Sequence, residues 1–448
     1  MSTRAHGPAP ARRGPAWIGL VLAVGATTPA LLLRVTDAGW SHAWLALLFG
    51  LGIVGAAFLL SWAAEVLQLD ISAGLALAVL ALIAVLPEYA VDFVFTWQGG
   101  RSFALHGIAC PSLSGGTESP CSLALANMTG ANRLLIGIGW TMVVFIAWWR
   151  HRVRARAGDA SSEGWTRVRL DRSKSIELAF LAAATVYSLT LPLRHSITLF
   201  DTAVLVGLFV AYMIRISGAP SGEPHLVGPA RWIGGFEPGA LRRAVVVVML
   251  VFAAGVILLC ADTFAENLVE AGKQYGLSEF LLVQWLAPLA SETPELLVAG
   301  LFAWRLNTNA GLGTLVSSKV NQWTLLVGTL PLVFAVASHS LHGLPIGPMQ
   351  REELFLTAAQ SFFAVAVLAD LSLSVREAWL LFGLFWAQFV LGAVVPESMH
   401  GVERVGVAGM YLALGAIVLL RDRTRMRTLL RDGFRTPHRE MTLGSELD

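Results

Sequence analysis

Apolar runs of about twenty residues recur along the whole chain, with short polar segments between them. Twelve runs are long enough to cross a bilayer, at 16–34, 43–64, 71–97, 121–149, 176–192, 197–216, 244–265, 278–305, 309–337, 351–369, 376–394 and 404–420. Charged residues make up only 14% of the 448 and hydrophobic residues 55%, whereas soluble domains carry about 25% charged residues. The pattern predicts an all-α polytopic membrane protein with about twelve transmembrane helices.

Lysine and arginine gather in four segments, and these predict the orientation. The segments are the head before residue 16, the loops 150–174 and 217–243, and the tail from Arg421. Loop 150–174 alone holds eight Lys or Arg, whereas each loop on the opposite face holds at most one. Because positive loops stay in the cytoplasm, we expect both termini to be cytoplasmic, in a bacterial-type plasma membrane. We expect the arginine-rich tail to be a solvated end that touches anionic lipid.

Two Pro-Glu pairs interrupt apolar runs at corresponding places. Pro87-Glu88 lies in "LALAVLALIAVLPEYAVDFVFTWQGG" (75–100), and Pro294-Glu295 lies in "SETPEL" (291–296). A tryptophan follows each glutamate by nine residues, and a span rich in small and polar residues follows each segment. Aligning these spans pairs Asn127 with Thr314, Gly130 with Ser317 and Asn132 with Lys319.

The two copies run in opposite directions through the membrane, as in many secondary transporters. The sequence therefore predicts two inverted five-helix repeats with one extra helix at each end. The expected units are 1–42, the first repeat 43–216 with its ion-binding segment 75–137, the cytoplasmic loop 217–243, the second repeat 244–394 with its ion-binding segment 288–326, and 395–448.

The Pro-Glu segments also predict an ion site at the midplane. Proline removes a backbone donor, so we expect the helix to bend or break near Pro87 and Pro294, with freed carbonyls facing a cavity. Asp92 lies one helical turn after Glu88, and Glu292 lies three residues before Glu295. Carboxylate, hydroxyl and amide oxygens together suit calcium or sodium. Alternatively, the acids pair with Arg133 and Lys319 and only hold helices together, although acids at membrane depth are by default functional.

The paired Pro-Glu segments, each followed by a small and Asn-rich helix, resemble the two alpha repeats of the cation/calcium exchanger superfamily. That superfamily comprises sodium/calcium and proton/calcium antiporters. The resemblance implies that Glu88 and Glu295 bind the transported metal ion. It also implies supporting roles in cation binding for Asn127, Asn132, Ser291 and Ser318. We expect the neighbouring acids Asp92 and Glu292 to take part in cation binding as well.

The sequence departs from the family pattern mainly in its charges. Ala84 and Val85 stand where hydroxyls are usual, and Asp92 and Glu292 stand where serines are common. Lys319 replaces an Asn or Asp, and Arg133 follows Asn132. If these four acids and two basic residues are all charged and all face the cavity, the net charge of the site is minus two. Lys319 could then replace one bound ion or carry a proton, or it could be a structural partner of Glu88 or Asp92.

These observations predict a secondary active cation antiporter that exchanges calcium for sodium or protons by alternating access. Sodium/proton exchange and a cation channel are the alternatives, and the inverted repeats favour the antiporter. No "GxxxxGK[ST]" segment is present, so we expect no ATP hydrolysis and no enzyme activity. We expect no cofactor besides the transported cations and no nucleic-acid partner. The expected surroundings are the lipid bilayer, and the oligomeric state stays open.

Cys110 and Cys121 fall in one loop on the expected outer face. A disulfide between them would be stable in an oxidising exterior.

Overall fold

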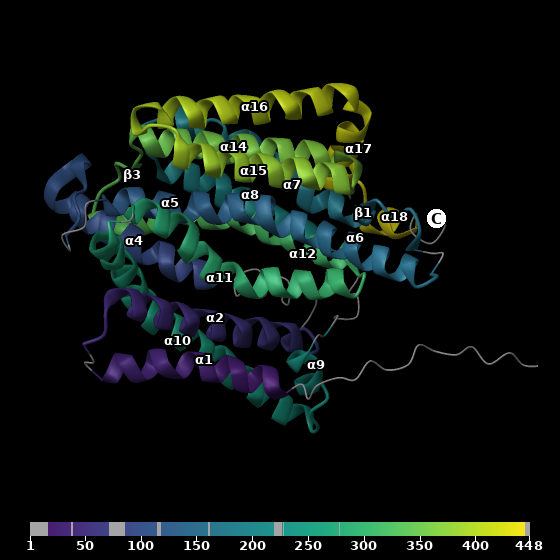
Figure 1. Cartoon of the computed structure of the whole chain (residues 1–448), viewed down its shortest axis with the longest axis horizontal. Coiled ribbons are helices and arrows are strands. Elements are labelled where there is room, and N and C mark those ends of the chain that lie inside the picture. The colour runs from purple at the N-terminus through teal and green to yellow at the C-terminus, as the bar shows by residue number, and fades with distance from the viewer. Residues whose placement is uncertain are drawn as a thin grey trace, which may run out of the picture.

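Long helices that run side by side make up almost the whole molecule (Figure 1). The structure is a computed structural model, and it describes residues 17–36, 39–70, 86–113, 118–159, 162–218, 226, 228–276 and 278–443. The expected start of the third span and the substitutions at Ala84 and Val85 therefore lie outside the described residues. The prediction of a helical membrane protein is confirmed.

The first half of the chain, residues 43–216 with the helix before it, contains α1(Trp17–Val35), α2(His42–Leu67), α4(Leu86–His106), η1(Gly107–Ala109), α5(Pro120–Leu134), η2(Leu135–Trp140), α6(Thr141–Arg156), β1(Arg167–Arg169), η4(Arg172–Lys174), α7(Ser175–Ser188), η5(Leu191–Leu193), β2(Ser196–Ile197) and α8(Leu199–Ser217). The short helix α9(Pro229–Gly234) follows.

The second half, residues 244–394 with their flanks, contains α10(Gly239–Tyr275), α11(Glu279–Trp304), α12(Thr308–Asn321), η6(Gln322–Leu326), α13(Val327–Ser338), β3(Leu344–Pro345), α14(Pro348–Val367), η7(Leu368–Asp370), β4(Ser372–Ser374) and α15(Val375–Val394). After it come η8(Glu397–Met399), α16(His400–Arg421), α17(Arg423–Phe434) and α18(His438–Leu443).

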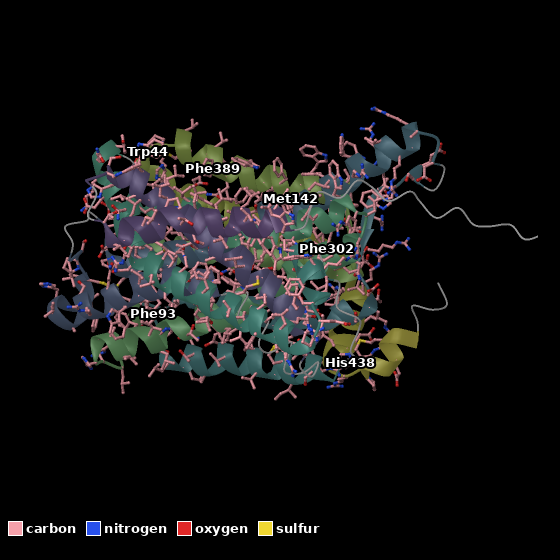
Figure 2. The ribbon with its side chains drawn as sticks, turned by 90° about the horizontal axis from the view of Figure 1, so that it is seen from below. Trp44, Phe93, Met142, Phe302, Phe389 and His438 are labelled. Atoms are coloured by element: carbon pink, nitrogen blue, oxygen red, sulfur yellow. A yellow bond between two sulfur atoms is a disulfide. The ribbon has the colours of Figure 1, made fainter. Side chains whose placement is uncertain are left out.

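Nine helical segments in the described ranges are long and apolar enough to cross a membrane. The three other spans expected from the sequence coincide with α4, α11 and α15, which lie among the nine in Figure 1. Large apolar side chains such as Trp44, Phe93 and Phe389 lie on the outside of the bundle (Figure 2). Such an exterior fits lipid rather than water.

The buried apolar residues form two clusters. The smaller one joins α1, α2, α9 and α10 with parts of α4, α5 and α11. The larger one joins α5 to α8 with α12 to α17. Helices α4, α5 and α11 therefore lie between the two clusters, where the predicted ion-binding segments come together.

Of the bend or break predicted near Pro294, the break is absent, because α11 continues from Glu279 to Trp304 through both Pro288 and Pro294. A proline removes only one backbone donor, and a membrane helix tolerates the gap when nearby groups compensate. The hydroxyls of Ser291 and Thr293 donate to carbonyls one turn earlier. The first break cannot be judged in the same way, because α4 begins at Leu86, directly after residues that the structure does not describe.

Two π-helical turns interrupt the helices that carry the small and polar residues. The turn η2 begins at Leu135, three residues after Asn132, and η6 begins at Gln322, three residues after Lys319. Single π-helical turns inside α-helices are frequent at functional sites. The turns therefore begin at equivalent positions in the alignment of the two Pro-Glu copies.

Two short antiparallel strand pairs, which the sequence analysis did not predict, lie at the ends of the bundle. At the arginine-rich end β1 pairs with β4, and at the other end β2 pairs with β3. Each pair joins one strand from either half of the chain. Strands β2 and β4 lead directly into helices that start with a capping box, formed by Thr198 and Asp201 in α8 and by Ser374 and Glu377 in α15.

The tail packs against the bundle with one face, which the expectation of a solvated end did not include, although most of its arginines are exposed. Helix α17 lies on α7, with Leu429, Asp432 and Gly433 buried. Arg172 donates to Asp432 over 2.7 Å, and Arg215 donates to the backbone oxygen of Gly433 over 3.1 Å. His438 marks this docked segment in Figure 2. The buried face of α17 was not predicted, because arginines recur through the whole of that helix.

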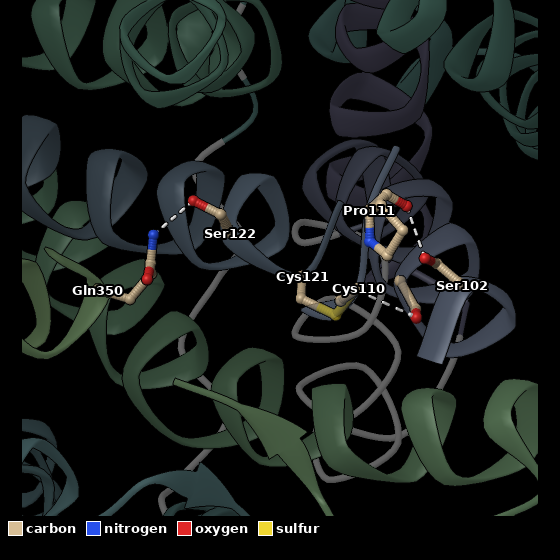
Figure 3. The surroundings of a disulfide bond; sticks show 7 residues. Ser102, Cys110, Pro111, Cys121, Ser122 and Gln350 are labelled. Carbon is tan, nitrogen blue, oxygen red and sulfur yellow. Dashed lines mark hydrogen bonds between the residues drawn. A yellow bond between two sulfur atoms is a disulfide. The ribbon is translucent and has the colours of Figure 1, made fainter. Parts of the chain in front are cut away.

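At the opposite end, the structure has a disulfide between Cys110 and Cys121 (Figure 3). Ser102 donates to the backbone oxygen of Pro111 over 2.6 Å, which ties the same loop to α4. Next to Cys121, Ser122 accepts a hydrogen bond from Gln350 of α14. The loop that precedes α5 is thus attached to both halves.

Candidate functional site

Four carboxylates from two helices gather between the two apolar clusters. Helix α4 contributes Glu88 and Asp92, which are 2% and 1% exposed, and α11 contributes Glu292, which is 4% exposed, and the less buried Glu295. Glu88 lies near enough to the other three to be repelled by their charges. The structure therefore brings together the four acids that the sequence analysis selected.

Close helix contact makes this grouping possible. A Cβ atom at Gly130 of α5 would lie 1.6 Å from the backbone oxygen of Gln284 in α11. Only glycine leaves room for two backbones at that separation. Gly130, which the repeat alignment pairs with Ser317, thus sets the distance between α5 and α11.

Amide groups hold two of the acids in place. The side chain of Asn127 donates to Asp92 over 2.7 Å, and that of Gln322 donates to Glu292. The acids nevertheless keep free oxygen atoms. Among the described residues, both oxygens of Glu88 have no hydrogen-bond partner, and neither does one oxygen each of Asp92, Glu292 and Glu295. Buried polar atoms are normally paired, so these oxygens are available to a cation or a proton.

Lys319 is fully buried and points at the other half of the chain. Its ammonium donates to the backbone and side-chain oxygens of Asn132, over 2.8 and 2.7 Å. It also lies 4.7 Å from the centre of the Trp323 ring, a favourable place for a cation. Glu88 and Glu292 attract it electrostatically, but within the described ranges Lys319 forms no direct ion pair with either. The proposed structural pairing with Glu88 or Asp92 is therefore not what the structure contains.

Arg133 does not face the four acids. It forms an ion pair of 2.8 Å with Glu353 of α14, and both side chains are at most 4% exposed. Gln284 and Arg404 also bind Glu353, over 2.9 and 2.8 Å. The arginine therefore connects α5 with α14 and α16. Because Arg133 does not face the acids, the site has a net charge of minus three rather than minus two when the four acids and Lys319 are all charged.

The hydroxyl of one predicted serine is used by its own helix. Ser291 donates to the backbone of α11 at Ala287 and Pro288. Ser318 is buried next to Lys319 in α12. The predicted part of both serines in cation binding stays a prediction.

No preassembled metal centre is present in the part of the chain that the structure describes, since no three acidic, histidine or cysteine side chains converge as ligands. Hard cations such as calcium take six or more oxygen ligands, many of them carbonyls and waters. The arrangement thus supplies carboxylates and amides that a cation could draw together, rather than a closed cage.

Sequence reasoning missed Gln322, Gln284, Glu353 and Arg404. Gln322 carried a usable signal, because it is a polar residue one turn after Lys319 inside an apolar run. Glu353 carried a weaker one, as an acid near the start of an expected span. Pairing it with Arg133 requires knowing that α14 packs on α5.

The family described as "Sodium/calcium exchanger protein" matches residues 41–218 and 245–393. The chain belongs to the sodium/calcium exchanger family. Among curated proteins a comparison finds no match. The family assignment confirms the predicted superfamily, and with it a membrane antiporter that transports calcium. The exchanger is thus a member of a transporter family rather than an enzyme family.

Solved structures agree with this assignment. The exchanger is similar to the crystal structure of the H+/Ca2+ exchanger CAX, with 38% identity over 93% of this chain and 98% of that one, and a TM-score of 0.81. It is also similar in fold to the Ca2+/H+ antiporter protein YfkE, with 11% identity over 90% of this chain and 99% of that one, and a TM-score of 0.55.

Proposed function

We propose that this exchanger is a calcium/proton antiporter that works by alternating access. The observation that carries the proposal is the cluster of Glu88, Asp92, Glu292 and Glu295 with its unpartnered oxygens. A buried carboxylate is stable only when a cation or a proton compensates its charge. Because calcium and protons compete for the same oxygens, their fluxes are coupled although the two ions are never bound together. The likeness to the H+/Ca2+ exchanger CAX supports protons as the counter-ion.

Within this proposal the acids have different tasks. Glu88 and Glu295 bind calcium, because they stand on the two equivalent Pro-Glu segments and have free oxygens. Asp92 and Glu292, which are already held by Asn127 and Gln322, complete the negative charge. Asn132 holds Lys319 in place, and the ammonium group takes the space and charge of one cation.

The proposed architecture is twelve spans in two inverted five-helix repeats, with one extra helix at each end. Three correspondences support it. The π turns start three residues after Asn132 and Lys319. Helices α8 and α15, the fifth helix of each proposed repeat, both begin with a capping box, formed by Thr198 with Asp201 and by Ser374 with Glu377. Each repeat also contributes one strand to each strand pair, at opposite ends of the bundle.

The arginine-rich end, with loop 150–174 and the docked tail, is proposed to face the cytoplasm of a bacterial-type cell. The positive residues support this orientation, as does the disulfide at the other end, because oxidising conditions prevail outside. The exchanger needs no cofactor beyond its cations, and its surroundings are the bilayer.

Proton movement during calcium uptake tests the function. Purified exchanger is reconstituted into sodium-free vesicles that enclose a pH-sensitive dye, and calcium is added outside. Entry of calcium against leaving protons makes the interior more alkaline, whereas a channel leaves the dye signal unchanged once the membrane potential is clamped. Empty vesicles and vesicles with Glu88→Gln protein are the controls. An unchanged interior pH during calcium entry would refute proton coupling.

A further inference from the structure

A cavity of about 500 Å³ lies at the arginine-rich end of the bundle. It stands where three parts of the chain meet, namely β1 of the first half, the η7–β4 connection of the second half, and α17 of the tail. The polar residues that characterise it, here called the arginine cavity, are Arg167, Arg169, Arg425, Ser175, Thr424 and Thr428. It is remote from the four-carboxylate cluster, and the transport mechanism makes no use of it.

The arginine cavity has a surplus of positive charge. Asp370 and Asp432 also line it, but each is already neutralised. Asp370 pairs with Arg425 over 2.8 Å, and Asp432 pairs with Arg172 over 2.7 Å. Although burial raises the pKa of Asp432, hydrogen bonds from Arg172 and Thr436 outweigh it and hold that pKa below its ordinary value. Both aspartates are therefore committed to cations that already face them.

Arg167 and Arg169 remain without an acidic partner. They alternate with the buried Val168 on β1, so both side chains stand on the same face of the strand. Arg167 makes only a long hydrogen bond of 3.5 Å to Ser372, and in the described part of the chain neither arginine forms an ion pair. Two guanidinium groups side by side suit an anion with several oxygens.

Ser175 supplies an independent sign of a ligand. It is 1% exposed and lines the arginine cavity, yet its hydroxyl has no hydrogen-bond partner among the described residues. Ser175 is the first residue of α7, and its backbone N–H already donates to the backbone oxygen of Arg172, so only its hydroxyl is available to a ligand. Thr424 and Thr428 add hydroxyls one turn apart on α17.

We propose that the arginine cavity binds a phosphomonoester. The two arginine forks without an acidic partner and the hydroxyl donors together match the oxygens of a phosphate group. The volume exceeds that of one phosphate and lies in the range of small-ligand pockets. The phosphate therefore belongs to a larger molecule, either soluble or the headgroup of an anionic lipid. Because the cavity joins both halves and the tail, its ligand holds α17 in the docked position.

Binding is tested on the full-length protein in detergent. Pyrophosphate and a nucleoside monophosphate are titrated at constant ionic strength, and binding is followed by equilibrium dialysis and by thermal unfolding through tryptophan fluorescence. The variants are Arg169→Gln and Ser175→Ala, and the matched control is Arg427→Gln, an exposed arginine of α17 that does not line the cavity. A second set uses nanodiscs of neutral lipid with and without phosphatidic acid, to distinguish a headgroup from a soluble ligand.

The proposal predicts saturable binding that Arg169→Gln weakens about tenfold or more, since hydrogen bonds to charged groups are strong, while Arg427→Gln leaves it unchanged. Stabilisation only by phosphatidic acid, and lost in Arg169→Gln, would identify the lipid headgroup as the ligand. No saturable effect of any probe, or equal losses in Arg169→Gln and Arg427→Gln, would overturn the proposal. Both readouts are independent of transport, so they stand or fall separately from the proposed antiport.

Discussion

The ammonium group of Lys319 lies 2.7 Å from the side-chain oxygen of Asn132, the residue that pairs with it in the alignment of the two Pro-Glu copies. Both residues are completely buried. The contact joins α5 and α12 at their equivalent points, beside four acids. A fixed positive charge thus stands beside the proposed cation site.

Replacing Lys319 by asparagine should change how many charges each cycle moves. The variant removes a cation that Glu88 and Glu292 attract, so the acids need another. Charges a few ångströms apart interact by a few kcal/mol in a protein, and we therefore expect apparent calcium affinity to rise about tenfold. Calcium uptake and current recorded on the same vesicles give the affinity and the charge per calcium.

The control for Lys319→Asn is Lys273→Gln, which removes a lysine that pairs with Glu270 far from the site. It should leave both quantities unchanged. Unaltered affinity and unaltered charge per calcium in Lys319→Asn would show that the lysine is only structural.

Glu88→Gln and Glu295→Gln should each abolish calcium transport while the protein stays folded. Glutamine keeps the shape and loses the charge that compensates calcium. The check is calcium uptake into vesicles, together with a gel-filtration profile that shows intact protein. Glu163→Gln, in an exposed loop, should transport like the wild type. Normal uptake by either site variant would refute the assignment of that glutamate.

Arg133→Leu should destabilise the folded protein strongly. It removes the partner of the buried carboxylate of Glu353 in α5. Because Arg404 still pairs with Glu353, the loss should stay below the roughly 3–5 kcal/mol of a buried pair that is broken completely. Thermal unfolding followed by fluorescence-detected gel filtration measures the loss. The double variant Arg133→Leu with Glu353→Leu should recover part of it, because the carboxylate is then gone and Arg404 keeps its pair with Glu352. A double variant as unstable as the sum of both single variants would contradict this account.

Gly433→Val should release the tail from α7. A Cβ atom there would lie 2.3 Å from the Cβ of Ala179 and 2.5 Å from the backbone oxygen of Ser175. Trypsin should then cut at the arginines of α17 in the variant much faster than in the wild type. Gly409→Val is the control, since nothing lies within 4 Å of its added Cβ. Equal cleavage of all three proteins would mean that α17 is not held by this contact.

The sequence was sufficient for the features that depend on local pattern. Apolar runs and arginine-rich loops predicted a helical membrane protein, and Pro-Glu pairs led to Glu88 and Glu295. The alignment made Asn132 and Lys319 equivalent positions, but the direct contact between them was not predicted.

Features that depend on packing were not predictable in this way. Nothing local to Arg133 shows that Glu353, on a helix from the other half, is its partner. Pro294 was expected to bend or break α11, and the helix does not break, because the loss of one backbone hydrogen bond is small beside the packing of a long helix. The buried face of α17 rests on Gly433 and Leu429, which look ordinary among seven arginines from Arg421 onward.

The most direct test of the central claim is calcium uptake into vesicles that contain the purified exchanger, under imposed gradients. One set has an outward proton gradient without sodium, and the other has an outward sodium gradient at equal pH on both sides. The account predicts saturable uptake driven by the proton gradient, and none with Glu88→Gln. Uptake driven by sodium alone would make sodium the counter-ion. No calcium uptake under either gradient, in vesicles that still exchange sodium for protons, would contradict calcium transport altogether.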